Sequence, residues 1–140
     1  MSDLVSQNLN MIFKSPKGET VHALKDLNFT IKKGELLTVL GPSGCGKTTL
    51  LNIAAGFIRP TSGTITLGNN EINGPGVDRG MVFQQGALFE WLTVSENVNF
   101  GLRMKKKDPE ETQKKVDEWL EIVGLKAVSY THLRAHETRS

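Results

Sequence analysis

The chain has 140 residues with a formal net charge of +2, and 38% of its residues are hydrophobic. This composition is typical of one ordinary globular domain, and so small a charge gives no reason to expect nucleic acid as a partner. The sequence contains no apolar run of the ~18 residues that a membrane-spanning helix needs, and residues 1–4 do not resemble the start of a secretory signal. The single cysteine, Cys45, excludes an internal disulfide and suits a reducing cytoplasm.

The first part of the chain reads as β-structure. Residues 4–13 predict a strand, residues 14–18 a turn, and residues 21–31 a second strand in which apolar and polar side chains alternate. Such alternation is typical of half-buried antiparallel strands. Residues 36–40 are nearly all apolar, which predicts a short strand buried on both faces.

A glycine-rich segment follows, and its spacing is G-x-x-x-x-G-K-[ST], the pattern of a phosphate-binding loop. It consists of Gly41, Pro42, Ser43, Gly44, Cys45, Gly46, Lys47, Thr48 and Thr49. Residues 49–57 after it carry apolar side chains at helical spacing, so the loop lies between a predicted strand and a predicted helix. Glycines let successive amide groups converge on phosphate oxygens, and the helix start adds the positive end of its dipole. We expect Lys47 to reach the β- and γ-phosphates and the Thr48 hydroxyl to coordinate Mg²⁺. The alternative is a chance match, which the flanking strand and helix disfavour.

Further elements can be predicted toward the C-terminus. Residues 64–67 alternate like a strand, and residues 81–83 form a short apolar strand that ends at Gln84. Thr93 and Glu96 fit a capping box at the start of one helix, and Asp108 precedes a proline at the start of another. In that second helix the spacing predicts one apolar face, with a C-terminal cap at Gly124. The face consists of Val116, Trp119, Leu120 and Val123.

Taken together, these motifs resemble the ATP-binding subunit of an ABC transporter. Residues 41–49 match the form of the phosphate loop in that family, residues 23–27 and 33–35 match the segment before it, and residues 82–84 match its Q-loop segment. Residues 73–80 and 91–98 are similar to the importers of taurine, alkanesulfonates, nitrate and related anions. Close relatives carry a proline before the tryptophan at 91, where this chain has Glu90. The resemblance covers about residues 4–127.

The resemblance implies an α/β fold, the P-loop NTPase of the ABC ATPase type, in truncated form. We expect an antiparallel β-region, the first part of a parallel core sheet, and helices. The implied ligands are ATP and Mg²⁺. Lys47 and Gln84 would be catalytic, and Thr48 and Gln84 would contact the metal ion. Phe13 is the candidate for stacking on adenine, with a place in the core of the first strand as the alternative.

The resemblance also implies partners and a location. Residues 87–98 would face the transmembrane permease subunit, although the apolar Leu88, Phe89 and Trp91 could equally pack internally. The parent protein would form a homodimer with a second ATPase subunit and would work indirectly with a periplasmic binding protein. It would lie as a peripheral protein on the cytoplasmic face of the inner membrane and energise uptake of a small anion such as taurine, alkanesulfonate or nitrate.

Several family motifs do not occur in the sequence. After Gly124 the family continues into the Leu-Ser-Gly-Gly-x signature, the Walker B aspartate with its catalytic glutamate, and the switch histidine, and none of them is present. We therefore expect residues 1–127 to be a partial ABC ATP-binding domain that binds ATP without turning it over. Residues 128–140 match nothing in the family and are expected to be a non-native or disordered tail, in which His132 and His136 are solvated.

Two other functions remain open at this stage. A small kinase would need a substrate lid and a GTPase a guanine-reading motif such as Asn-Lys-x-Asp, and neither is found. A short nucleotide-binding or regulatory module without catalysis is the third possibility.

Overall fold

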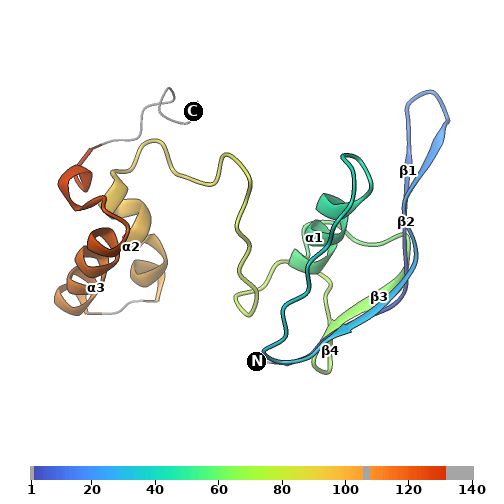
Figure 1. Cartoon of the computed structure of the whole chain (residues 1–140), viewed down its shortest axis with the longest axis horizontal. Coiled ribbons are helices and arrows are strands. Elements are labelled where there is room, and N and C mark those ends of the chain that lie inside the picture. The colour runs from blue at the N-terminus through green and yellow to red at the C-terminus, as the bar shows by residue number, and fades with distance from the viewer. Residues whose placement is uncertain (1, 106–107, 132–140) are drawn as a thin grey trace. The chain divides into compact units, whose positions relative to one another are not determined.

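The structure, a computed structural model, describes residues 2–105 and 108–131 (Figure 1). The chain divides into two compact units, Met1–Met81 and Val82–Ser140. The elements are β1 (Leu4–Lys14), β2 (Thr20–Ile31), α1 (Lys47–Ala55), β3 (Ser62–Leu67), β4 (Asn70–Glu71), α2 (Val94–Met104), α3 (Pro109–Ile122) and the 3-10 helix η1 (Lys126–Val128). The first unit therefore holds the described strands and α1, and the second unit holds the other helices. None of the helices in the described part of the chain combines the length and apolarity needed to cross a membrane.

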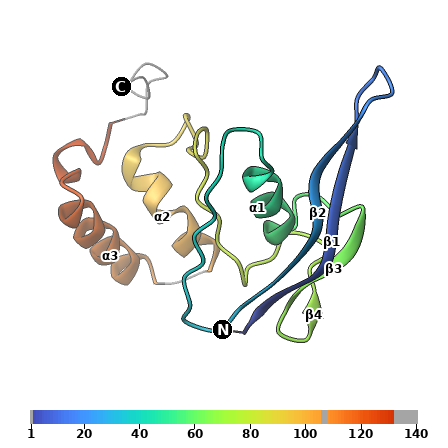
Figure 2. The same ribbon diagram turned by 45° about the vertical axis from the view of Figure 1, so that its right-hand side comes forward.

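The four strands form one antiparallel sheet in the order β2-β1-β3-β4. The strands predicted from residues 4–13, 21–31 and 64–67 are confirmed, and only the two-residue β4 was missed. Figures 1 and 2 show β1 and β2 joined in a long hairpin, with α1 against one face of the sheet. The predicted antiparallel β-region is therefore present.

Side-chain amides hold the β1–β2 hairpin together where its register shifts. Asn8 and Asp26 have φ of 48° and 45°, in the left-handed region that breaks a regular ladder. At these positions, the Asn8 amide donates to Asn28 Oδ1 at 2.8 Å, and the Asp26 amide donates to Asn10 Oδ1 at 2.9 Å. These side chains replace ladder hydrogen bonds, so the backbone donors stay satisfied through the bulges.

The core of the first unit forms between the sheet and α1. Its buried side chains are Leu9, Leu24, Leu50, Ile53, Ile65 and Ile72. Leu9 is fully buried, and Ile53 and Ile65 are 1% exposed, so residues from β1, α1 and β3 meet at the centre. The core thereby fixes α1, and with it the loop that precedes α1.

Truncating the core is expected to destabilise the first unit. Ile53→Ala should cost about 2–5 kcal/mol of unfolding free energy, because it removes buried methylenes and leaves a cavity. Leu51→Ala on the same helix is the matched control. Leu51 is 55% exposed, and we expect its loss to cost under ~1 kcal/mol. Urea unfolding monitored by circular dichroism would measure both, and equal midpoints for the two variants would contradict this core.

The predicted strands at residues 36–40 and 81–83 do not form. Both segments are irregular, and Leu36, Leu40 and Val82 are 92%, 87% and 96% exposed. A parallel strand is stable only when neighbouring strands pair with it and cover both of its faces. In the described residues every strand belongs to the antiparallel sheet, so these segments lack that pairing. The expectation that the first part of a parallel core sheet is present is therefore wrong for the described residues.

The helix starts of the second unit agree with the sequence. Thr93 Oγ1 accepts from the Glu96 amide at 3.2 Å, while the Glu96 carboxylate accepts from the Thr93 amide at 2.8 Å, which completes the capping box of α2. At the start of α3, Asp108 Oδ1 accepts from the Glu110 amide at 2.8 Å, and Pro109 occupies the first turn. Both predicted starts are confirmed.

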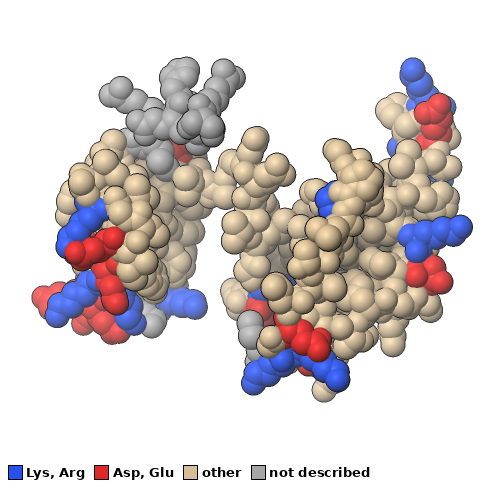
Figure 3. All heavy atoms as spheres, viewed as in Figure 1, with Lys and Arg blue, Asp and Glu red and all other residues tan. Residues whose placement is uncertain are grey.

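The buried face of α3 differs from the predicted one. Val116 and Leu120 are buried as expected, but Thr112 is the third buried residue, while Trp119 and Val123 are 44% and 62% exposed. The prediction of one apolar face is therefore correct for Val116 and Leu120 and wrong as a buried face for Trp119 and Val123. Elsewhere on α3, lysines lie among Asp and Glu residues, and Lys115 pairs with Glu111 at 3.1 Å, as on a solvated helix (Figure 3).

The C-terminal end of α3 has the predicted glycine. Gly124 has φ of 74°, and the Leu125 amide donates to the Leu120 carbonyl at 2.8 Å, as in a Schellman motif. Beyond it, the Ser129 carbonyl accepts from the Ser95 amide at 2.8 Å. The predicted boundary of a tail at residue 128 stays a prediction, and His132 and His136 lie outside the described residues.

Removing the capping box should destabilise the second unit. Thr93→Ala is expected to cost about 1 kcal/mol, because the Glu96 amide loses its acceptor and the reciprocal bond loses its geometry. Thr93→Ser retains the hydroxyl and should recover most of this stability. Thermal unfolding followed by the helical signal would compare the variants, and identical midpoints would show that the box contributes nothing.

Candidate functional site

The predicted phosphate loop leads directly into α1, which begins at Lys47. Gly44 and Gly46 have φ of 79° and 96°, values that an L side chain rarely adopts. A Cβ at Gly46 would lie 2.3 Å from the carbonyl oxygen of Ala23 in β2. The loop therefore passes so close to the sheet that only glycine fits at this position.

The start of α1 has the properties of an anion site. No side chain caps this helix, and its first turn carries no acidic residue. The amides of the first turn therefore retain their unneutralised positive end. Such a helix start favours phosphate oxygens.

Lys47 adds a full positive charge to the loop. Its ammonium donates to the carbonyl of Gly41 at 2.7 Å and to that of Pro42 at 2.6 Å, and it lies 3.4 Å from the Cys45 sulfur. The side chain thus folds back over the loop instead of extending into solvent. The two backbone carbonyls therefore fix the position of the ammonium, whose positive charge can bind an anion.

The loop folds on itself where Gly41 approaches Cys45. A Cβ at Gly41 would lie 2.6 Å from the sulfur of Cys45. Cys45 is exposed and has a free thiol. A larger residue at position 41 would therefore require the Cys45 side chain to move.

Thr48 offers an oxygen ligand of the kind that Mg²⁺ prefers. Its side chain is exposed, and it belongs to the first turn of α1 beside Lys47. A hydroxyl oxygen of this kind fits Mg²⁺, which takes few protein ligands and completes its shell with phosphate oxygens and water. Within residues 2–105 and 108–131, no three His, Cys, Asp or Glu side chains gather into a metal site.

The other two predicted site residues lie outside the loop. Phe13 lies near the end of β1, opposite Val21 of β2, and is 43% exposed. The alternative of a core position is therefore excluded, and stacking on adenine stays a prediction. Gln84 lies in an exposed bend of the second unit.

The segment predicted to meet a permease contains both exposed and packed aromatic residues. Leu88 and Trp91 are 54% and 72% exposed, whereas the ring of Phe89 lies 4.5 Å from that of Phe100 and 5.3 Å from that of Trp91. The side chain of Asn97 holds this segment, because it accepts from the Phe89 amide at 2.8 Å and donates to the Phe89 carbonyl at 3.0 Å. Phe89 therefore packs internally, whereas Leu88 and Trp91 are exposed, and contact with a permease stays a prediction.

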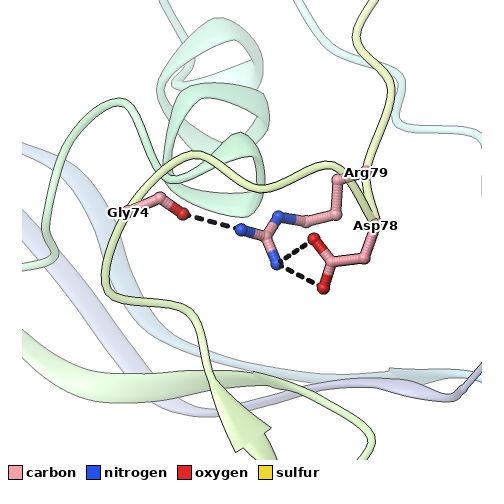
Figure 4. A network of polar contacts seen from close by, with 3 residues as sticks. All are labelled: Gly74, Asp78 and Arg79. Atoms are coloured by element: carbon pink, nitrogen blue, oxygen red, sulfur yellow. Dashed lines mark hydrogen bonds and ion pairs between the residues drawn. The ribbon is translucent and has the colours of Figure 1, made fainter. Parts of the chain in front are cut away.

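An ion pair that the sequence did not reveal closes the loop after β4. Arg79 donates to the Gly74 carbonyl at 2.6 Å and pairs with Asp78 at 3.1 Å (Figure 4). Both charged residues line a cavity of about 650 Å³ in the first unit, together with apolar side chains of α1 and the sheet. Nothing in the local sequence pattern separates Arg79 from an ordinary surface arginine.

Comparisons with known proteins identify relatives of this chain. The sequence profile of the ABC transporter family matches residues 24–139. The chain is 81% identical over 131 residues to the taurine import ATP-binding protein TauB of Pelagibacter ubique, an alignment that covers 94% of this chain and 49% of that protein. It is 57% identical over 125 residues to TauB of Roseobacter denitrificans, covering 89% of this chain and 47% of the relative. The chain therefore spans about half the length of these curated relatives.

Solved structures show the same fold. The dimeric structure of MJ0796, a bacterial ABC transporter cassette, aligns with a TM-score of 0.80 and 32% identity over 94% of this chain and 63% of the cassette. A post-hydrolysis state of MJ0796 bound to ADP and Pi aligns with a TM-score of 0.79 over 92% of this chain and 61% of the cassette. The loop geometry, the family profile and these structures lead to one conclusion: the chain belongs to the ABC transporter family, whose cassettes are ATPases.

Proposed function

We propose that this chain is part of the ATP-binding subunit of an ABC importer, and that residues 41–49 bind the triphosphate of Mg-ATP. The observation that carries the proposal is the Lys47 ammonium, held by the Gly41 and Pro42 carbonyls at the uncapped start of α1. Related proteins support it, because the 81% identical relative is a taurine import ATP-binding protein.

Each predicted site residue has a separate role in this proposal. The amides of the loop and the first turn of α1 donate to phosphate oxygens, and Lys47 neutralises charge on the β- and γ-phosphates. Thr48 supplies one oxygen to Mg²⁺, whose chemistry is to bridge and neutralise the phosphates. Phe13 offers a ring face to the base, and Gln84 offers a carbonyl oxygen to the metal and an amide hydrogen to the attacking water.

Calorimetric titration of the chain tests nucleotide binding. We expect Mg-ATP and Mg-GTP to bind with similar affinity, because stacking on an aromatic ring does not distinguish the two bases, whereas adenosine should not bind detectably. Strong selectivity for Mg-GTP would favour a GTPase instead. Binding of adenosine as tight as that of Mg-ATP would show that the phosphate loop is not the main contact.

The proposed biological role is import of a small anion such as taurine. Residues 87–98 would contact the permease, a second ATPase subunit would form the dimer, and a periplasmic binding protein would deliver the substrate. The protein would lie on the cytoplasmic face of the inner membrane. The support is the exposure of Leu88 and Trp91, the taurine-import relatives, and the dimeric cassette among the similar structures.

A chimaera tests this role. The matching first half of Pelagibacter ubique TauB is replaced by residues 1–127 of this chain, in cells that depend on TauB for taurine uptake. Restored uptake is expected, and the same chimaera with Lys47→Ala should restore none. A chimaera that is expressed but restores no taurine uptake would contradict the taurine assignment. It would not bear on nucleotide binding, which the calorimetric titration tests.

For the 140 residues themselves we propose binding without turnover. The sequence contains no signature motif and no Walker B aspartate with its glutamate, so the general base and the charge-stabilising partner of this chemistry are not supplied by these residues. Release of phosphate from Mg-ATP by the purified chain, abolished by Lys47→Ala, would contradict this.

A further inference from the structure

Arg79 is a largely buried arginine in the loop between β4 and Gln84. Its side chain is 17% exposed. One end of the guanidinium donates to the Gly74 carbonyl at 2.6 Å, and the other pairs with the Asp78 carboxylate, with Nη1 3.1 Å from Oδ1 and 3.2 Å from Oδ2. Figure 4 shows the guanidinium between these two partners, so it closes the turn from Gly74 to Arg79. We call the contacts of Arg79 with Gly74 and Asp78 the clasp.

Gly74 is also where this loop meets the C-terminal end of α1. Gly56 follows α1 with φ of 81°, and a Cβ there would lie 2.1 Å from the Gly74 oxygen and 2.3 Å from its carbonyl carbon. The same carbonyl therefore contacts the end of α1 and accepts the hydrogen bond from Arg79. Because interiors are close-packed, the loop cannot approach the helix this closely with any larger residue at 56.

This contact is continuous with the phosphate loop. The helix that ends at Gly56 begins at Lys47, and its Ile53 is anchored in the core at 1% exposure. On the other side, Arg79 precedes Gln84 by only five residues. The clasp thus connects the C-terminal end of the helix that carries Lys47 with the loop that precedes Gln84 in the sequence.

Stability alone does not account for this arginine. Its Nε is buried and has no hydrogen-bond partner among the residues that the structure describes. A buried donor without a partner is unfavourable, and an apolar side chain would fill the same space without that penalty. The planar guanidinium, however, reaches the Gly74 carbonyl with one nitrogen and the Asp78 carboxylate with another at the same time.

We propose that Arg79 is a positioning residue that holds the start of the Gln84 segment against the end of the phosphate-loop helix, so that Gln84 responds to nucleotide at the loop. This inference rests on the proposed function, since it assigns Gln84 a contact with bound Mg-ATP. The clasp limits the arrangements that the chain after Arg79 can take. Breaking it should free that segment while leaving the phosphate loop itself intact.

Two-dimensional ¹H–¹⁵N NMR of the 140-residue chain tests this directly, because the side-chain amide of Gln84 gives its own signal. Mg-ATP is titrated into the wild-type chain, Arg79→Gln, Arg79→Lys and the matched control Arg59→Gln, an exposed arginine of the same unit. We expect the Gln84 side-chain signal to shift in the wild-type chain and the control. In both Arg79 variants that shift should fall severalfold, while the loop amides report a Kd within about threefold of the wild-type value, because the phosphate contacts are retained.

Gly56→Ala provides an independent approach from the other side of the clasp. It should reduce the Gln84 shift in the same way, and combining it with Arg79→Gln should add little, because both changes act on Gly74. Additive losses would show that Gly56 and Arg79 act separately and would overturn the clasp.

The outcomes separate this inference from the proposed function. The role of Arg79 would be overturned by a Gln84 side-chain signal that shifts as much in Arg79→Gln as in the wild-type chain. It would also be overturned if this signal did not shift in the wild-type chain when Mg-ATP binds. Neither result would contradict nucleotide binding. If the wild-type chain binds no Mg-ATP, the proposed function fails. The clasp is then tested in spectra recorded without nucleotide. Backbone order parameters of residues 80–82 should then fall toward or below about 0.6 in Arg79→Gln, and values equal to wild type would overturn the clasp.

Discussion

Replacing Lys47 by alanine is expected to weaken Mg-ATP binding by about a hundredfold or more. In this structure the ammonium is fixed by the carbonyls of Gly41 and Pro42, at 2.7 and 2.6 Å. We expect this ammonium to contact the β- and γ-phosphates, and a hydrogen bond to a charged group is worth about 1.5–3 kcal/mol. Two such contacts exceed the ~2.7 kcal/mol that a hundredfold change in affinity requires.

The measurement is calorimetric titration with Mg-ATP, in parallel with thermal unfolding of both proteins. Lys47 lies on the surface of the loop, outside the core cluster, so the unfolding midpoint should change little. Lys33→Ala, which removes an exposed lysine from the same unit, should leave the affinity as in the wild-type chain. If Lys47→Ala and Lys33→Ala bound Mg-ATP equally well, the loop would not be the nucleotide site.

The features that the sequence predicted correctly depend on neighbours in the chain. A capping box needs only Thr93 and Glu96, and both bonds are present. The start of α3 needs only Asp108 and the proline after it. In the phosphate loop, likewise, glycine spacing and the helix start are local, so the loop and α1 were predictable together.

Features that depend on distant contacts were not predictable in the same way. Residues 36–40 have the pattern of a buried strand, but a pattern does not supply the strands that must pair with it, and Leu36 is 92% exposed. The clasp at Arg79 depends on Gly56 approaching Gly74 across 18 positions of sequence, and no periodicity reports such an approach. Burial on α3 was likewise decided by what α3 packs against, which placed Thr112 inside and Trp119 partly outside.

Gly46→Ala is expected to be the most damaging single substitution in the loop. Its φ of 96° is strained for alanine, which costs about 1–2 kcal/mol. In addition, the new Cβ would lie 2.3 Å from the Ala23 oxygen and 3.2 Å from Leu24 Cδ2, so β2 and the start of α1 would have to separate. Because Leu24 is part of the core, we expect a total loss of about 3–4 kcal/mol, and nucleotide binding should be lost with it.

Gly44→Ala separates the two causes. Gly44 has a similar φ of 79°, but nothing lies within 4 Å of the position that its Cβ would take. Only the conformational cost of about 1–2 kcal/mol should appear there. For a unit of the size of Met1–Met81, each kcal/mol lowers the unfolding midpoint by roughly 4–8 °C, so differential scanning calorimetry can resolve the two variants. Equal midpoints would mean that the loop does not press against β2, and the close approach that positions Lys47 would then be wrong.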